Sequence, residues 1–123
     1  MNQAEALKQR TTQFALRILR LCRALPRTDE GRVVSRQLLR SATSVAANYR
    51  AVCRARSRAE FTSRLGVVVE EMDETAFWMD FLIQGEFLPA ERLDGLRKEA
   101  DELLAIFAAS QRTAKGRQSS MNK

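Results

Sequence analysis

The amino-acid sequence predicts an all-α protein folded as one antiparallel up-down-up-down four-helix bundle. Apolar residues recur at steps of three and four along most of the chain, which is the period of amphipathic helices. The chain has five glycines and two prolines, too few for a turn-rich sandwich or barrel. Its 123 residues suit one domain with one core. Because the predicted connections are short, consecutive helices must lie side by side and run in opposite directions.

The first expected helix ends at Pro26 and the polar run that follows it. Its apolar stripe consists of Leu7, Phe14, Ile18, Leu21 and Leu25. At 100° per residue, a row of arginines falls on the opposite arc: Arg10, Arg17, Arg20, Arg23 and Arg27. The pattern therefore predicts a helix with one buried face and one strongly basic face.

The second expected helix runs from about residue 32 to residue 56. Its inner face holds Val34, Leu38, Val45, Tyr49 and Val52. Its outer face carries a second and more regular arginine row, with Thr43 and Ala47 filling the gap: Arg32, Arg36, Arg40, Arg50 and Arg54.

Two helices are expected in the second half of the chain. Ser57 is a suitable N-cap for the third, and Glu60 completes a capping box. Its core stripe is Phe61, Leu65, Val68, Met72, Met79 and Ile83, and Gly85 ends it. Pro89 opens the fourth helix, whose inner face is Leu93, Leu96, Ala100, Leu103, Leu104 and Phe107. We expect the bundle to span residues 1–112 and residues 113–123 to form a basic, disordered tail.

The charge of the chain is distributed unevenly. Residues 1–64 carry 14 Lys and Arg against 4 Asp and Glu, whereas residues 65–109 carry 3 against 11. Residues 110–123 add four basic residues and no acidic ones. The net charge of the whole chain is +6. This asymmetry indicates either a surface that binds polyanions or pairing between the basic and acidic helices inside the fold.

Three aromatic residues of the third helix point away from its core stripe: Phe77, Trp78 and Phe81. They share an arc with Glu70 and Glu74. Large aromatic side chains on an outward arc lower solubility unless another surface covers them. We interpret them as a self-association surface, the alternative being an unusually wide core stripe.

Little in the sequence points to catalysis. The absence of histidine excludes His-based triads and His-ligated metals. Cys22 and Cys53 lie too far apart on antiparallel helices for a disulfide and are expected to be small buried hydrophobic residues. The one enzyme-like spacing is an ExxE and ExxD pair, formed by Glu71, Glu74, Glu91 and Asp94, as in all-α Mg²⁺-dependent nucleotide hydrolases. These carboxylates should be too far apart to share an ion. We therefore expect no enzyme, metal or cofactor.

The chain is also expected to be cytoplasmic. Its longest uncharged stretches hold nine residues, whereas a membrane span requires about 20. The start of the sequence lacks the basic and apolar regions of a signal peptide.

The central segment resembles a known bacterial family. The stretches Arg36–Ser41, Ser44–Ala51, Arg54–Phe61 and Glu71–Met79 together resemble the four helix bundle proteins encoded in intervening sequences of large-subunit ribosomal RNA genes. The resemblance extends from about Phe14 to Leu88. Tyr49-Arg50-Ala51 departs from the sequence that many members carry after the asparagine, Asn48 in this chain.

The resemblance implies a homopentameric barrel, in which Asn48 supports a helix contact and the three aromatic residues lie between subunits. A related branch is the accessory variability protein of diversity-generating retroelements, whose basic pentamer binds nucleic acid and a reverse transcriptase. The resemblance therefore implies that the partner of this chain is RNA, DNA or a ribonucleoprotein.

The sequence therefore leads to three hypotheses. The first is a non-enzymatic, oligomeric bundle that contacts nucleic-acid phosphates through Arg20, Arg23, Arg27, Arg32, Arg36, Arg40, Arg50 and Arg54. No exposed aromatic residues are expected among these arginines, which argues against base stacking and therefore against specificity for single strands. The second is a protein-interaction module whose basic helices dock on an acidic surface. The third is the Mg²⁺-dependent hydrolase.

Overall fold

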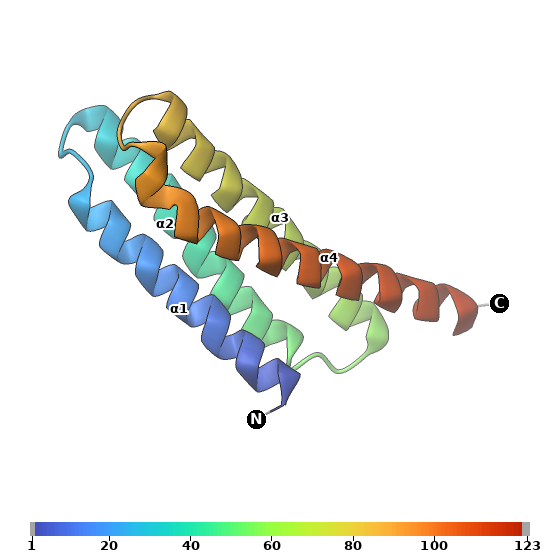
Figure 1. Ribbon diagram of the computed structural model, residues 1–123. Coiled ribbons are helices and arrows are strands. Elements are labelled where there is room, and N and C mark those ends of the chain that lie inside the picture. The colour runs from blue at the N-terminus through green and yellow to red at the C-terminus, as the bar shows by residue number, and fades with distance from the viewer. Residues whose placement is uncertain (1, 122–123) are drawn as a thin grey trace.

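The computed structural model describes residues 2–121 and confirms the all-α fold. Its elements are α1 (Gln3–Ala24), α2 (Asp29–Val52), α3 (Arg58–Gln84), a short 3₁₀ helix η1 (Ala90–Leu93) and α4 (Asp94–Met121). Consecutive helices run antiparallel (Figure 1). Helix α2 packs most extensively on α3, whereas α1 and α4 touch over a much smaller area.

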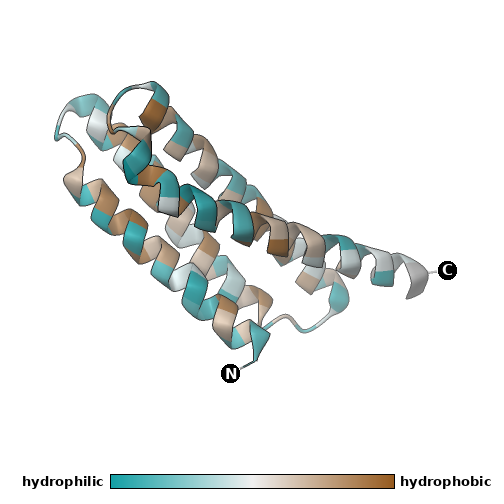
Figure 2. Cartoon of the chain, in the orientation of Figure 1, coloured by the Kyte–Doolittle hydropathy of each residue, from teal (hydrophilic) through white to brown (hydrophobic). Residues whose placement is uncertain are grey.

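The core consists of the apolar stripes that the sequence predicts. Every predicted inner residue of α1 and α2 is buried, and so are four of the six assigned to α3 and five of the six assigned to α4. The remaining three, Phe61, Ile83 and Leu104, are partly buried and pack against the core. Apolar residues recur among polar ones along every helix (Figure 2). The period of the sequence therefore fixes which face of each helix turns inward.

The first two helix ends lie close to their expected positions. Helix α1 stops at Ala24, just before Pro26. Helix α2 begins at Asp29 and ends at Val52, three to four residues earlier at each end than expected. It begins earlier because Thr28 caps it, accepting a hydrogen bond from the Gly31 amide. Arg54 therefore lies in the connection after α2 rather than on the helix.

Helix α3 starts and stops where the sequence predicts. The Ser57 hydroxyl accepts a hydrogen bond from the Glu60 amide at 3.0 Å, and the Glu60 carboxylate accepts one from the Arg56 amide at 3.1 Å. Gly85 is the C-cap with φ of −80°, and it is Glu86 that adopts the left-handed conformation, with φ of 61°. The chain then turns through η1 into α4.

The end of α4 differs from expectation. We expected a disordered tail from Thr113, but α4 continues as a helix through Met121; residues 122–123 lie outside the described residues. The segment contains no proline, and Ala114, Lys115 and Arg117 are good helix formers. Thr113 and Ala114 also line a hollow with Phe61 of α3, so the start of the segment is packed against the bundle.

Candidate nucleic-acid interface

A cleft of about 340 Å³ lies between the end of α1 and the start of α2. Its apolar lining is buried or half-buried and includes Leu19, Cys22, Leu25 and Leu39, together with the exposed Pro26. Four exposed arginines also line it, all of them members of the predicted site: Arg23, Arg27, Arg32 and Arg36. The structure therefore brings half of the predicted phosphate-binding residues to one place.

The connection between α1 and α2 holds this cleft in shape. Gly31 is buried in the first turn of α2, and a Cβ atom there would lie 2.2 Å from the carbonyl oxygen of Pro26. Only glycine permits this close approach of two backbone segments. The approach keeps Arg27 of the connection close to Arg32 of the helix.

The cleft is electrostatically unbalanced. Among the described residues, Arg32 is the one cleft arginine with a carboxylate within 4.0 Å, that of Asp29 at 3.3 Å in an exposed pair. Such pairs contribute little, since water screens both charges. Cys22 also lines the cleft, and burial raises the pKa of its thiol, so the group is uncharged at neutral pH. The cleft can thus attract anions but offers no activated nucleophile.

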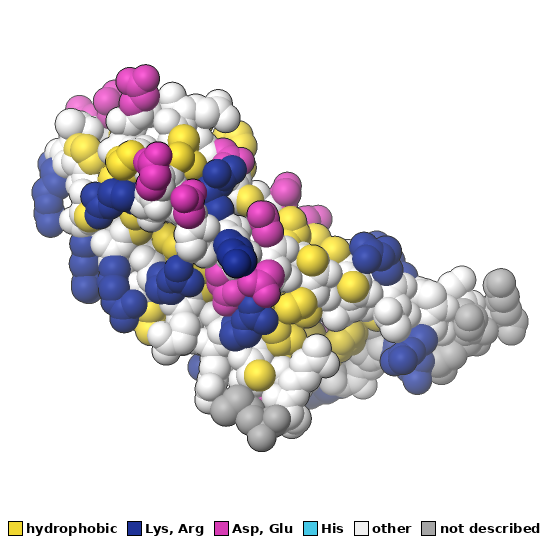
Figure 3. All heavy atoms as spheres, in the orientation of Figure 1, with side chains coloured by type: hydrophobic (Ala, Val, Ile, Leu, Met, Phe, Trp, Pro, Cys, Tyr) yellow, Lys and Arg dark blue, Asp and Glu magenta, His cyan; other side chains and the backbone are white. Residues whose placement is uncertain are grey.

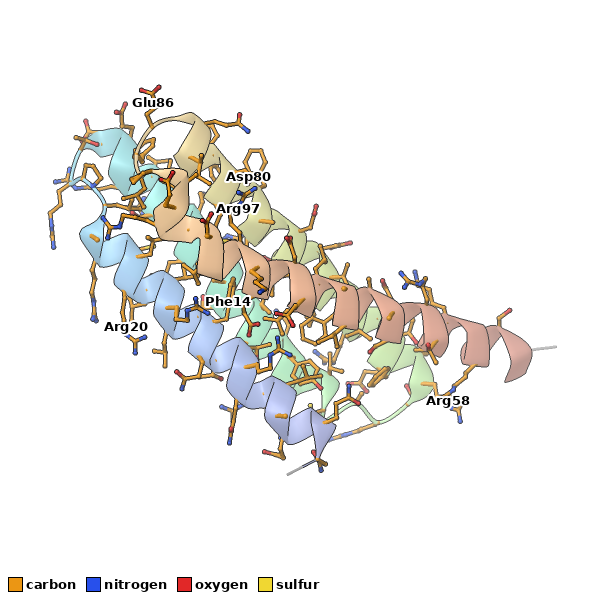
Figure 4. All side chains as sticks on the ribbon, in the orientation of Figure 1. Phe14, Arg20, Arg58, Asp80, Glu86 and Arg97 are labelled. Carbon is orange, nitrogen blue, oxygen red and sulfur yellow. The ribbon has the colours of Figure 1, made fainter. Side chains whose placement is uncertain are left out.

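Arg20 lies apart from these four residues. It lines a second groove of about 330 Å³ on the α4 side of α1, together with Arg17 and Arg92. Figure 3 shows dark-blue side chains gathered along the edge formed by α1, and Figure 4 shows Arg20 pointing away from the bundle. Basic residues therefore occupy both flanks of α1 at this end of the molecule.

Arg40, which the sequence places among the phosphate-binding residues, forms ion pairs with α3 in the structure. Its guanidinium is bound by two carboxylates of α3, Glu74 at 2.5 Å and Glu71 at 3.4 Å. The same hydrogen bond lowers the pKa of Glu74. A phosphate would have to displace these carboxylates, so we remove Arg40 from the candidate interface and describe it as a link between α2 and α3.

Arg50 and Arg54 lie at the opposite end of α2. Arg50 is 14 residues beyond Arg36, or about 21 Å along the helix axis. Arg54 lines a hollow of about 450 Å³ with Arg56, Arg64 and Glu60. The regular row in the sequence is therefore two basic clusters, separated by the neutralised Arg40 and by exposed Thr43 and Ala47.

The predicted aromatic surface is present on α3. Phe77 and Phe81 are 55% and 44% exposed, whereas Trp78 is half-buried against the core. The rings form one cluster, with centroids 4.9 Å apart for Phe77 and Trp78 and 5.5 Å apart for Trp78 and Phe81. The Trp78 indole N–H also faces Glu74 at 3.4 Å. Two of the three residues thus present apolar area to water.

The four acidic residues of the ExxE and ExxD spacing are divided between two places in the structure. Glu71 and Glu74 bind Arg40, while Glu91 lies in η1 and Asp94 begins α4. Within residues 2–121, no three carboxylate or cysteine side chains come close enough together to hold a metal ion.

Asn48 and the cysteines complete the set of predicted residues. The Asn48 amide donates to the backbone oxygen and hydroxyl of Ser44 in its own helix, both at 2.9 Å. Cys22 and Cys53 are unbonded to each other and half-buried.

Sequence reasoning did not include Arg56, Arg64 and Arg92 among the site residues. None belongs to the two arginine rows, and each joins a basic surface only because the fold brings a third segment alongside. Arg56 and Arg92 lie next to predicted helix ends, whereas Arg64 lies about two turns inside the third predicted helix.

Comparison with known proteins agrees with the fold. The family model described as 23S rRNA-intervening sequence protein matches residues 5–109. A crystal structure of a protein of unknown function from the S23 ribosomal protein family of Bacteroides thetaiotaomicron superimposes with a TM-score of 0.81 at 30% identity, covering 90% of this chain and 99% of that one. No curated protein matches the sequence. None of the described helices has the length and apolar character needed to span a membrane.

Proposed function

The chain belongs to the 23S rRNA-intervening sequence protein family, and from this premise we propose that it is a non-enzymatic, self-associating bundle that binds the phosphate backbone of nucleic acid. The observation that carries the proposal is the cleft between α1 and α2, where four exposed arginines surround an apolar floor and only Arg32 has an acidic neighbour among the described residues. A positive surface with few internal counter-charges gains free energy by releasing condensed counterions from a nucleic acid.

The contacts would be made by three groups of arginines. The cleft contributes Arg23, Arg27, Arg32 and Arg36, the flank of α1 contributes Arg20, and the far end of α2 contributes Arg50 and Arg54. One guanidinium group can donate two parallel hydrogen bonds to a phosphate, which suits arginine to this role. Because phosphates carry no sequence information, binding is expected to be steeply salt-dependent and nearly independent of sequence.

A second surface supports self-association. Phe77 and Phe81 expose neighbouring aromatic rings on α3, and neither residue lines the cleft. Burying this area in a homo-oligomer would remove the cost of exposing it to water. The number of subunits we propose is five, following the family resemblance. A ring would repeat the basic surfaces and multiply the contacts to one nucleic acid or to a ribonucleoprotein such as a reverse transcriptase–RNA complex.

The test measures binding to a fluorescent duplex of about 20 base pairs, as DNA and as RNA, over a range of salt concentrations. We expect the slope of log K against log salt to fall by about 2.7 when Arg23→Gln, Arg27→Gln and Arg36→Gln are combined, because about 0.9 is lost per phosphate contact. An affinity that barely changes with salt would contradict the phosphate mechanism.

Arg36 and Arg40 provide a matched pair of single variants, since they lie one turn apart on the same helix. Arg36→Gln should lower the salt slope by about 1, whereas Arg40→Gln should leave it unchanged because Glu71 and Glu74 already bind that side chain. Loss of the oligomer in Arg36→Gln, with duplex binding intact, would instead support a protein-interaction module. Turnover of nucleoside triphosphates with Mg²⁺ would support the hydrolase.

A further inference from the structure

The last turns of α4 extend beyond the part of the chain that the family shares. The family model ends at residue 109, whereas α4 continues to Met121. Figure 1 shows this end of α4 passing the start of α3. A Cβ added at Gly116 would meet no atom within 4 Å, so this side of the helix is open to solvent. We refer to residues 110–121 as the arm.

The arm is basic and contains no acidic residue. It carries Arg112, Lys115 and Arg117, all of them exposed. Because it is an isolated helix over its last turns, its cations have no internal carboxylate to pair with; among the described residues, no ion pair involves any of the three. A solvated helix of this composition gains little from tertiary packing, which indicates that its side chains serve contacts outside the bundle.

The base of the arm is fixed to the bundle by packing against α3. Ala109, Ser110, Thr113 and Ala114 line a hollow of about 330 Å³ with Phe61. Five residues further along α3, a Cβ at Gly66 would lie 2.9 Å from the side-chain amide nitrogen of Gln111, so the Gln111 side chain reaches this part of α3. The arm therefore leaves the bundle in a defined direction beside the first turns of α3.

Those turns of α3 belong to a second basic surface, which we call the corner. The corner comprises the cations of residues 50–64: Arg50, Arg54, Arg56, Arg58 and Arg64. Its one carboxylate, Glu60, is bound by the Arg64 guanidinium at 3.0 Å and by the Arg56 amide at 3.1 Å, and these contacts lower its pKa. Figure 4 shows Arg58 at the end of the bundle from which α4 projects.

The corner and the arm lie on two sides of the same turns of α3. Glu60 and Arg64 line the corner hollow, whereas the adjacent Phe61 lines the hollow under the arm together with Arg117. Residues 50–64 carry five cations against one carboxylate, and residues 110–121 carry three against none. Together, the two segments carry eight cations against one carboxylate.

We propose that the arm and the corner form one phosphate-binding surface, which extends the nucleic-acid contact of this chain beyond that of the family's shared bundle. The inference rests on the proposed function. The arm contributes about 18 Å of additional helix, at 1.5 Å per residue. Its cations would lie along the backbone of a nucleic acid that is already held at Arg50, Arg54 and Arg58.

The test compares Lys115→Gln combined with Arg117→Gln against a control on the same helix, Arg97→Gln combined with Lys98→Gln. Both double variants remove two exposed cations, but the control pair lies among Asp94, Glu99 and Asp101, where phosphate is repelled. We expect the arm variant to lower the salt slope for duplex binding by about 2 and the control to leave it unchanged. Far-UV circular dichroism should show equal helix content in both.

Two results would overturn the inference. An unchanged slope in the arm variant, while the cleft variant loses contacts, would contradict the role of the arm and leave the proposed function standing. Equal losses in the arm variant and the control would show that net charge alone matters. By contrast, a wild-type chain that binds no duplex at low salt would contradict the proposed function itself.

Discussion

The outward faces of α2 and α3 differ in chemistry, although the two helices share the largest interface in the molecule. The outward strip of α2 consists of arginines separated by Thr43 and Ala47, with its apolar residues largely confined to the inner face. Helix α3 carries apolar residues on more than one face, and Val67, Phe77 and Phe81 are exposed. The first face is stable in water and attracts polyanions, whereas the second gains free energy from being covered by protein.

Arg40 lies at the boundary between these two faces. Arg40 is paired there with two carboxylates of α3, Glu71 and Glu74, so its positive charge is balanced beside the aromatic face. The comparison therefore suggests that the outward arginines bind nucleic acid, whereas the aromatic face of α3 binds other subunits. Three predictions test this division, beginning with the largest expected effect.

The aromatic face should control assembly alone. Phe77→Glu combined with Phe81→Glu should weaken self-association about a thousandfold, because buried aromatic anchors are each worth about 2 kcal/mol or more in an interface. Val33→Glu is the matched control, since Val33 is a similarly exposed apolar residue, 54% accessible, on α2. Analytical ultracentrifugation should show dissociation in the first variant only. A double variant that still assembles would show that Phe77 and Phe81 do not hold the oligomer together.

The cleft should depend on the glycine that closes the α1–α2 connection. Gly31→Ala should destabilise the fold by about 1–3 kcal/mol, because the new methyl group would collide with the Pro26 carbonyl oxygen, and it should weaken duplex binding as the connection shifts. Gly116→Ala is the control, because its Cβ would enter open space and should add about 1 kcal/mol of helix stability. Equal melting temperatures for the two variants in thermal unfolding would argue against a rigid connection.

The smallest expected effect concerns the boundary residue Arg40. Because Arg40 lowers the pKa of Glu74, the stability that this pair contributes is fully present above the ordinary carboxylate pKa. It is lost as the pH falls through the lower pKa of the folded state. Trp78 is the sole tryptophan and lies beside Glu74, so its fluorescence should report the protonation directly.

Arg40→Gln should raise the midpoint of this titration toward the ordinary carboxylate value. Lys8→Gln, which removes a cation paired with Glu5 at a distant site on α1, should leave it in place. A Trp78 titration that is the same in the wild type and in Arg40→Gln would mean that Glu74 is not held by Arg40 in solution.

The sequence was sufficient to predict the fold, because burial repeats with the period of the helix. The stripe from Leu7 to Leu25 and the cap at Ser57 follow from local patterns alone. The site was only partly predictable. Arg36 and Arg40 occupy equivalent positions in the sequence row, and they differ only because two carboxylates of α3, more than thirty residues away, reach Arg40. The helical end of α4 was missed because its small polar residues fit a tail as well as a helix.

The central claim is that the basic surfaces bind nucleic acid and the aromatic face of α3 holds the oligomer together. The most direct test is the molecular mass in solution, measured by light scattering at about 0.1 and 1 M salt, with and without a duplex RNA. The account predicts a multiple of the subunit mass that persists at high salt, because apolar contacts hold the oligomer, and an RNA complex that forms only at low salt, because screening weakens phosphate contacts. A monomer under all conditions, or an oligomer that dissociates in high salt together with its RNA, would contradict it.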